Sequence, residues 1–262
     1  MLPATVLAFD IETVPDVDGA RRLLDLEGLD DRAVGEILFT RRRQATGSDF
    51  LPHHLQRVVA IAAVLRHEGQ VRVWALGGPE AGEAELIRRF FDGIERYAPV
   101  LVSWNGSGFD LPVLHYRALV HGVQAPRYWD TGEDDQSFRW NNYLSRYHQR
   151  HTDLMDVLGA YQARAGAPLD EVAVLLGLPG KMGMRGGDVW GAWLAGEIGA
   201  IRDYCETDAL NTYLVYLRFE LLRGRLDPAG YEAECERVAR ALAADGRPHL
   251  AAFLRRWRGG AG

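Results

Sequence analysis

The first apolar stretch of the chain, residues 5–14, predicts a buried β-strand, but two acids interrupt it. Asp10 and Glu12 flank Ile11 in the segment VLAFDIETVPD. Residues i and i+2 of a strand point to the same face, so the two carboxylates would lie side by side. Such neighbours repel and raise each other's pKa unless a cation or a proton lies between them. By itself the pattern fits equally well a strand that runs into solvent and a polar turn closed by Pro15.

The next apolar patterns predict a hairpin followed by a helix. Residues 17–50 are polar and suggest one or two short helices in an insertion. Residues 55–76 predict two strands joined by the turn HEGQ. Residues 82–99 predict a helix that ends before Pro99. Its apolar residues at helical spacing are Leu86, Ile87, Phe90, Phe91 and Ile94.

The second half alternates strands, turns and helices. The expected elements are a strand at 100–104, a glycine-rich turn at 105–110, a helix at 111–122, an irregular insertion at 123–150, a strand leading into a helix at 151–158, a helix at 168–180, a flexible glycine-rich loop at 181–188, and helices from 188 to 223 with a break at 196–199. The acidic patch at Glu133, Asp134 and Asp135 is interpreted as a solvated loop. This order predicts one α/β domain over residues 1–225, with a mixed sheet flanked by helices. Residues 226–262 are expected to form a helical extension packed on that domain.

Composition narrows the class of protein without deciding it. The 262 residues, 47% of them hydrophobic, suffice for one sizeable core. No apolar run is long enough to span a bilayer, and the N-terminus has no signal-peptide pattern, so we expect a cytoplasmic protein. Cys205 and Cys235 form no disulfide framework and fit a reducing compartment. The net charge of −6 argues against an indiscriminate polyanion binder, but not against a nucleic-acid enzyme whose bound cations offset the acidity.

Two further acids break the polarity expected of their elements. Asp110 follows the turn NGSGFD at the start of a helix, where it is either an N-cap or a carboxylate at the carboxyl edge of the sheet. Tyr204 and Asp208 are four residues apart and share a helix face that is otherwise apolar. An acid beside such a face needs a partner, and for a lone aspartate that partner is usually an arginine. Asp203 and Glu206 are expected to face water.

Asp10, Glu12, Asp110 and Asp208 together offer the oxygen ligands that hard divalent cations prefer. Two such ions, roughly 3.5–4 Å apart, stabilise both the attacking and the leaving oxygen of a phosphodiester. The hypothesis is therefore a site for two divalent metal ions, Mg²⁺ or Mn²⁺, in which Asp10 bridges both.

The segments FDIET, NGSGFD and YCETD resemble, in order, the three motifs of the DnaQ-like (DEDD) 3′–5′ exonucleases, which have a ribonuclease-H-like fold. The third motif has the Tyr-x-x-x-Asp form of the tyrosine subgroup, since Asp203 stands where the histidine subgroup has His. More closely, the segments HTDLMDVL, PLDEVAVLLGLPGK and YCETDALNTYLVYLRF resemble bacterial predicted exonucleases related to the proofreading domain of family-B DNA polymerases, and the resemblance covers most of residues 5–225.

The resemblance implies a role for each matching residue. Asp10, Glu12 and Asp208 would hold the catalytic metal ion, and Asp10 with Asp110 the second. Tyr204 would orient the attacking water. The 3′-hydroxyl of the substrate would meet Glu12 and the backbone near Thr13.

For a few other residues, the resemblance implies a role in substrate binding, or two interpretations stay open. Asn105 and Phe109 would fix the terminal nucleotide, although Phe109 fits a core position equally well. Lys181 is either a phosphate contact or a solvated side chain. Minor expectations are a supporting role for Asp153, a helix cap at Asp156, a core position for Trp104, a solvated face at Arg41–Arg43, and loop positions for His53 and His54.

The expected activity is metal-dependent removal of nucleoside 5′-monophosphates from the 3′ ends of single-stranded DNA or RNA. The expected enzyme acts as a free-standing nuclease, or proofreads in trans. Two alternatives are a catalytically silent nucleic-acid-binding or subunit-docking protein on the same fold, and an endonuclease. The sequence indicates no protein partner.

Overall fold

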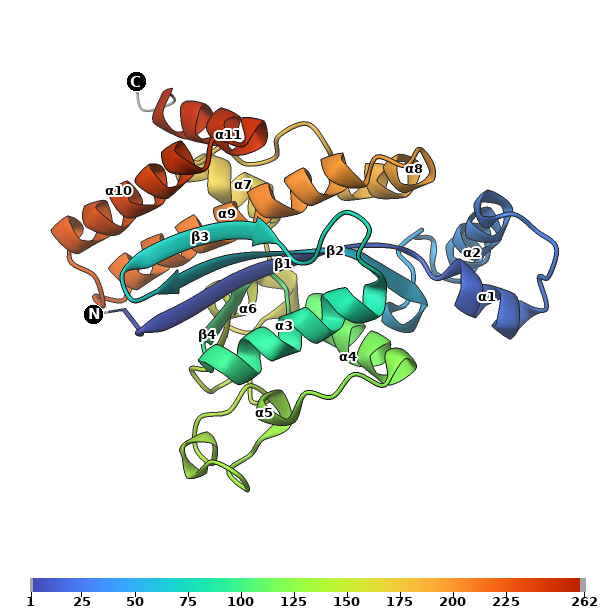
Figure 1. Cartoon of the computed structure of the whole chain (residues 1–262), viewed down its shortest axis with the longest axis horizontal. Coiled ribbons are helices and arrows are strands. Elements are labelled where there is room, and N and C mark those ends of the chain that lie inside the picture. The colour runs from blue at the N-terminus through green and yellow to red at the C-terminus, as the bar shows by residue number, and fades with distance from the viewer. Residues whose placement is uncertain (1, 260–262) are drawn as a thin grey trace.

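A computed structural model describes residues 2–259 and contains one five-stranded mixed sheet in the order β3-β2-β1-β4-β5 (Figure 1). The strands are β1 (Thr5–Pro15), β2 (Gln56–His67), β3 (Gln70–Ala75), β4 (Val100–Ser103) and β5 (His151–Asp153). Strands β1, β2 and β3 pair antiparallel, while β4 and β5 run parallel to β1. The predicted mixed α/β sheet and its hairpin are confirmed. Residues 1 and 260–262, which the sequence assigns to the domain and its extension, lie outside the described residues.

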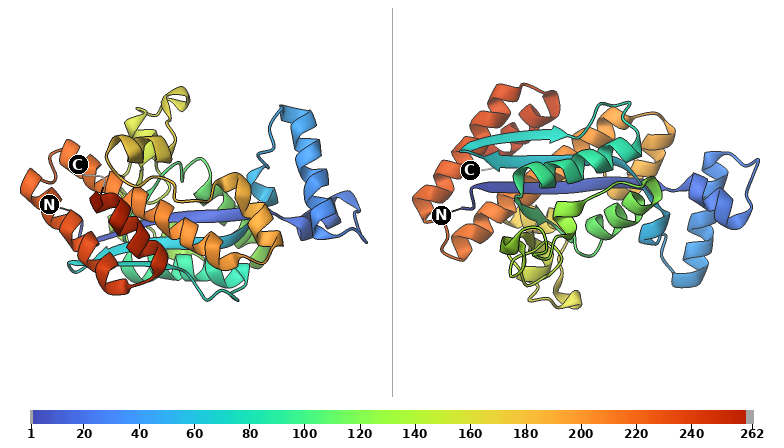
Figure 2. Two further views of the ribbon diagram at one scale, coloured as in Figure 1. Left: turned by 90° about the horizontal axis from the view of Figure 1, so that it is seen from above. Right: turned by 60° about the horizontal axis from the view of Figure 1, so that its bottom comes forward.

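Strand β1 supplies both hydrophobic cores because its side chains alternate between the two faces of the sheet. Leu7, Phe9 and Ile11 pack with α3 (Glu83–Tyr97) and α4 (Asp110–His121). Val6 and Ala8 pack on the other face against the long helix α9 (Ile198–Leu222). Figure 2 shows the sheet between these layers from two further directions. Asp10 and Glu12 therefore lie on the α9 face of the central strand.

The backbone around the two acids has a feature that leaves room for other side chains. Asp10 lies opposite Ala62 and Glu12 opposite Ala60, both fully buried residues of β2. The pairing of β1 with β2 shifts register between Glu12 and Thr13, which marks a β-bulge. Bulges redirect side chains next to functional sites. Because the two alanine side chains are small and the bulge changes the direction of the strand, side chains of α9 have room to approach β1 at this point.

The first insertion forms two helices, α1 (Val17–Leu24) and α2 (Asp31–Thr46), which project from one end of the sheet (Figure 1). The second helix, with 16 residues, is longer than predicted. The insertion has its own small core, made of Val17, Ala20, Val34, Leu38 and Leu51.

The second insertion, at 123–150, is largely irregular, as predicted. It contains only α5 (Pro126–Trp129) and a 3₁₀ turn (Gln136–Phe138) among its described elements. Its acidic patch lies in a loop, where Glu133 and Asp134 are exposed as predicted and Asp135 is partly buried. Asp135 accepts a hydrogen bond from the Ser137 N–H at 2.9 Å and pairs with Arg127 at 3.1 Å.

The remaining helices cover the α9 face of the sheet and its β3 edge. They are α6 (Leu154–Leu158), α7 (Leu169–Leu175), α8 (Val189–Leu194), α10 (Pro228–Asp245) and α11 (Pro248–Gly259), with a 3₁₀ turn at Gly186–Asp188 before α8. The predicted break between α8 and α9 is present. Helices α10 and α11 pack on α9, and α10 also contacts β3. In the described part of the chain, no helix is both long and apolar enough to cross a membrane.

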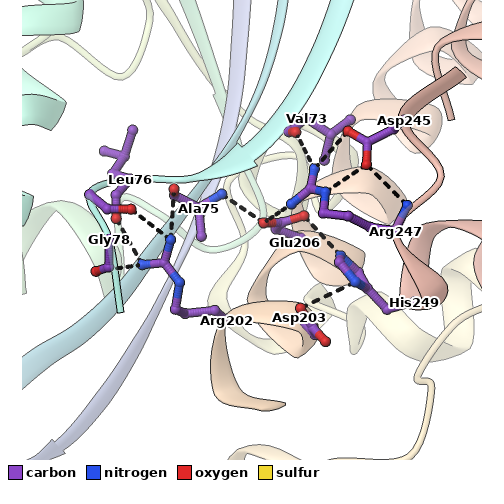
Figure 3. A network of polar contacts seen from close by, with 11 residues as sticks. Val73, Ala75, Leu76, Gly78, Arg202, Asp203, Glu206, Asp245, Arg247 and His249 are labelled. Atoms are coloured by element: carbon purple, nitrogen blue, oxygen red, sulfur yellow. Dashed lines mark hydrogen bonds and ion pairs between the residues drawn. The ribbon is translucent and has the colours of Figure 1, made fainter. Parts of the chain in front are cut away.

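Glu206 contradicts the expectation that it faces water: it is buried beneath the C-terminal helices (Figure 3). Its carboxylate accepts the Ala75 N–H at 2.8 Å, and it pairs with Arg247 at 2.7 Å and His249 at 2.9 Å. A buried carboxylate requires such partners. Asp203 is half exposed, as expected, and lies 3.2 Å from the other ring nitrogen of His249.

Candidate active site

Strand β1 and helix α9 bring three potential ligand atoms together in the middle of the sheet. One side-chain atom each of Asp10, Glu12 and Cys205 lies within 4.8 Å of the other two. The Cys205 thiol lies 3.3 Å from the Asp10 carbonyl oxygen and 3.5 Å from Asp10 Oδ2. Sequence reasoning missed Cys205, because a single cysteine on an apolar helix face gives no signal of this contact.

Asp110 reaches the same region from the first residue of α4. The N-cap residue of α4 is Phe109, which makes no side-chain cap bond, so the alternative of Asp110 as an N-cap is wrong. The Asp110 carboxylate instead accepts hydrogen bonds from its own backbone N–H and from that of Ile11. This acid of α4 therefore lies against β1 at Ile11, the residue that separates Asp10 and Glu12 in the sequence.

Asp208 completes the cluster from α9 and does not pair with an arginine. The Tyr204 hydroxyl, one turn earlier on the same helix, donates a hydrogen bond to the Asp208 carboxylate. Lys181 is the cation that acts on both Asp208 and Glu12 electrostatically. Within residues 2–259, none of the four acids forms an ion pair with a cationic side chain.

The pKa of every acid in the cluster is raised, and burial is the largest cause for each. Burial, and then repulsion from the other carboxylates, hold the pKa values of Asp10 and Glu12 well above their ordinary range. Burial raises the pKa of Asp110 to about 7 and that of Asp208 to about 6. Four acids that are mostly buried and lack a cationic partner have the chemistry of a divalent-cation site. The donor set therefore fits a metal ion.

Tyr204 is held in its protonated form beside these acids. Burial raises the pKa of its hydroxyl, and the charges of Asp208 and Glu12 raise it further. The hydroxyl is therefore a hydrogen-bonding group at neutral pH, and not a base.

Asp153 fixes the turn that leads to Asp110. Its carboxylate accepts the N–H groups of Asn105 at 2.9 Å and Ser107 at 2.8 Å, and it also caps α6. Asn105 has a φ of 62°, a left-handed conformation that asparagine tolerates better than most residues. The predicted helix cap at Asp156 is wrong, because Asp153 is the cap and Asp156 pairs with Arg146.

A cleft of about 770 Å³ opens beside Glu12 and contains three of the four predicted substrate-binding residues. These are Thr13, Phe109 and Lys181. The Thr13 hydroxyl donates to Gln56 Oε1 at 2.9 Å. Asn105 does not line the cleft, although its backbone carbonyl accepts the N–H of Phe109.

Several minor predictions can also be placed. Trp104 is half buried at the edge of the core and donates through Nε1 to the Ala167 carbonyl. His53 and His54 lie in a 3₁₀ turn, near Phe109 and Tyr116 respectively. Arg41–Arg43 is not simply a solvated run, because Arg42 and Arg43 bind the segment that follows α2.

The mixed sheet and its cluster of acids define the chain as a nuclease-like α/β protein. It belongs to the family of predicted 3′–5′ exonucleases related to the exonuclease domain of PolB, whose model matches residues 48–257. This match confirms the resemblance found in the motifs, and with it the ribonuclease-H-like fold class. Asp110, Tyr204 and Asp208 lie in the matched range, and β1, with Asp10 and Glu12, precedes it.

Two curated relatives are archaeal DNA polymerases. DNA polymerase 1 of Sulfurisphaera ohwakuensis is 57% identical over 37 residues, which are 14% of this chain and 4% of the polymerase. The DNA polymerase of Archaeoglobus fulgidus is 27% identical over 136 residues, 51% of this chain and 17% of the polymerase. The chain thus matches only a small part of each relative.

Proposed function

We propose that this protein is a metal-dependent 3′–5′ exonuclease of the tyrosine subgroup that acts on single-stranded nucleic acid and releases nucleoside 5′-monophosphates. The observation that carries the proposal is that Glu12, Asp110 and Asp208 surround Asp10, with the Tyr204 hydroxyl beside three of these acids and no ion pair to any of the four within residues 2–259. Because the relatives are DNA polymerases, DNA is the first substrate to test.

In this proposal Asp10, Glu12 and Asp208 hold one divalent ion, Mg²⁺ or Mn²⁺, and Asp10 and Asp110 hold a second. When bound, such ions lower the pKa of water and neutralise charge on the phosphate. The raised pKa values of Asp10 and Glu12 support this assignment, since a cation stabilises buried carboxylates and removes the mutual repulsion that adds to the effect of burial.

The protein's own groups position the reactants. The protonated Tyr204 hydroxyl orients the attacking water by hydrogen bonding. Thr13 and Glu12 face the cleft and would meet the 3′-hydroxyl, while Phe109 contacts the terminal nucleotide. Asn105 acts by holding the turn that carries Phe109, and Lys181 provides a positive charge for the scissile phosphate.

The test is incubation of the purified protein with 5′-labelled single-stranded DNA and RNA oligonucleotides in Mg²⁺, Mn²⁺ or EDTA. We expect a ladder that shortens from the 3′ end and is absent in EDTA. Asp10→Asn should lower the rate by roughly 10²–10³-fold or more, because charge stabilisation at the reacting phosphate is lost. Tyr204→Phe should lower it by roughly 10²-fold, because the attacking water is no longer oriented, while metal binding persists.

Circular single-stranded DNA is the control substrate. Cleavage of the circle would contradict an exonuclease and indicate an endonuclease. Binding of the oligonucleotides without shortening, in either metal, would contradict the proposal and favour a catalytically silent binding protein.

A further inference from the structure

The first insertion forms one wall of the cleft that the catalytic strand also lines. Glu12 and Thr13 of β1 border the cleft on one side. Residues that the insertion contributes to the lining are Glu36, Phe39, Arg43, Ser48, Asp49 and Phe50. A segment that the sequence marked only as a polar insertion is therefore part of the wall around the proposed 3′ end.

Phe50 is a large apolar residue in this wall, and its side chain is exposed to solvent. Its side chain is 55% exposed, although an exposed phenylalanine gains nothing from burial in the fold. Its ring centroid lies 5.3 Å from that of Phe109, with the ring planes inclined at 55°. The His53 ring lies 5.9 Å from the same Phe109 ring. Two aromatic faces from distant parts of the sequence thus meet at the cleft.

The backbone holds Phe50 in place, so its exposure does not come from a loose loop. Arg42 Nε donates to the Phe50 carbonyl at 2.8 Å, and the Phe50 N–H donates to Ser48 Oγ at 3.1 Å. The neighbouring Asp49 receives two hydrogen bonds from the Arg43 guanidinium, at 2.6 and 3.2 Å. A ring carried on a fixed segment is already positioned to bind.

The insertion is also anchored to the rest of the molecule at two points. Asp16, which caps α1, pairs with the buried Arg117 of α4 at 2.5 Å. Gly35 of α2 lies so close to the Trp190 indole of α8 that a Cβ would approach it to 2.8 Å. These contacts fix the wall relative to the catalytic strand.

We propose that Phe50 and Phe109 form a stacking site for a base within the last two nucleotides of the single strand. This inference rests on the proposed exonuclease function. Bases stack on exposed aromatic rings in a sequence-tolerant manner. Lys181 and Arg185 line the same cleft and provide positive charge for the adjoining phosphates. The first insertion is thereby a substrate-binding arm that sets affinity for the 3′ end.

The test compares Phe50→Leu and Phe50→Trp on oligonucleotides that are intact or abasic at the last or the penultimate position. Phe50→Leu keeps an apolar side chain but loses the aromatic face, so its KM should rise roughly 10- to 100-fold with kcat unchanged. Phe50→Trp should resemble the wild type. On one of the abasic substrates, Phe50→Leu and wild type should have the same KM, because there is no base left to stack.

Leu23→Ala is the matched control, since Leu23 is 65% exposed on α1 of the same insertion and does not line the cleft. It should leave KM unchanged. The inference would be overturned if Phe50→Leu had the same KM as the wild type. It would also be overturned if the KM of Phe50→Leu rose equally on the intact substrate and on both abasic substrates.

Binding measured in EDTA by fluorescence anisotropy separates this inference from the proposed function. If the wild type shortens no oligonucleotide, the proposed function fails. The stacking site would still be supported if Phe50→Leu bound the intact strand more weakly than the wild type did, and if this difference disappeared with an abasic strand. Equal binding of the intact strand by both proteins would refute it.

Discussion

Asp10 is in contact with groups from several elements, and this explains why its carboxylate is difficult to accommodate without a cation. Glu12 is its neighbour on β1, and the Cys205 thiol of α9 approaches its side chain. Asp110 and Asp208 add repulsion from α4 and α9. A side chain in this position weakens the metal-free fold, a common property of functional sites.

The pH dependence of stability should report the burial of the Asp110 carboxyl, which is the largest cause of its raised pKa. Its pKa is about 7 in the fold, against an ordinary value of 3.8. Between these values the native state keeps a proton that the unfolded chain has released, so raising the pH lowers the free energy of unfolding. The loss is on the order of a few kcal/mol and is complete above about pH 7. Metal-free wild type should therefore lose stability relative to Asp110→Asn between pH 5 and pH 8.

The measurement is the urea-unfolding midpoint of both proteins in EDTA at each pH. Comparison with Asp110→Asn is needed because His115 and His151, whose pKa values are lowered to about 4, change stability in the opposite direction. Adding Mg²⁺ should raise the wild-type midpoint at pH 8 and have little effect at pH 5, where protons compete. A stability difference between the two proteins that does not vary with pH would contradict the prediction.

At the scale of elements, Arg117 joins α4, α3 and the start of the first insertion. This buried guanidinium binds Glu83 through Nε at 2.7 Å and Nη2 at 2.5 Å, and Asp16 through Nη1 at 2.5 Å. Glu83 also accepts the Val58 N–H of β2 at 2.7 Å. The ion pairs thus connect the helix that carries Asp110 to the arm that carries Phe50.

Arg117→Ala should destabilise the protein by roughly 3–5 kcal/mol, because it removes the guanidinium from two buried carboxylates, of which only Glu83 keeps another ionisable partner, His121. Thermal unfolding would measure the loss. The matched control is Arg89→Ala, which removes an exposed pair with Glu85 on α3 and should cost less than about 1 kcal/mol. Similar losses for the two variants would show that the buried network is not a main source of stability.

The elements that the sequence predicts well are those whose buried face follows from the spacing of apolar residues within the element itself. The alternation in β1 and the helical spacing in residues 82–99 determine their buried faces directly. Glu206 and Asp156 were misplaced because their partners are distant in sequence or depend on which residue caps a helix. Arg247 and His249 lie more than 40 residues after Glu206, and nothing near Glu206 indicates them. The role of Phe50 was missed for the same reason, since Phe109 belongs to another element.

At the scale of the whole molecule, Glu206 connects the sheet to the C-terminal helices. Glu206→Ala removes the acceptor of the Ala75 N–H and leaves Arg247 and His249 without their shared partner. We expect a loss of about 2–4 kcal/mol in the free energy of unfolding, measured in urea. Asp203→Ala, on the same helix but half exposed, should lose less than about 1 kcal/mol. Equal losses would indicate that the C-terminal helices are held mainly by apolar packing.

The contacts along β3 also limit the pairing of this edge strand with strands of other protein molecules. Arg247 binds the Val73 carbonyl, Glu206 binds the Ala75 N–H and Arg202 binds the Ala75 carbonyl, so three backbone groups of this edge strand already have side-chain partners. At the opposite edge, β5 has only three residues. An edge strand that is short or already bonded is a poor template for intermolecular pairing. Helix α9 and Arg247, which lies just before α11, therefore protect the β3 edge of the sheet from pairing with other chains, in addition to completing the core.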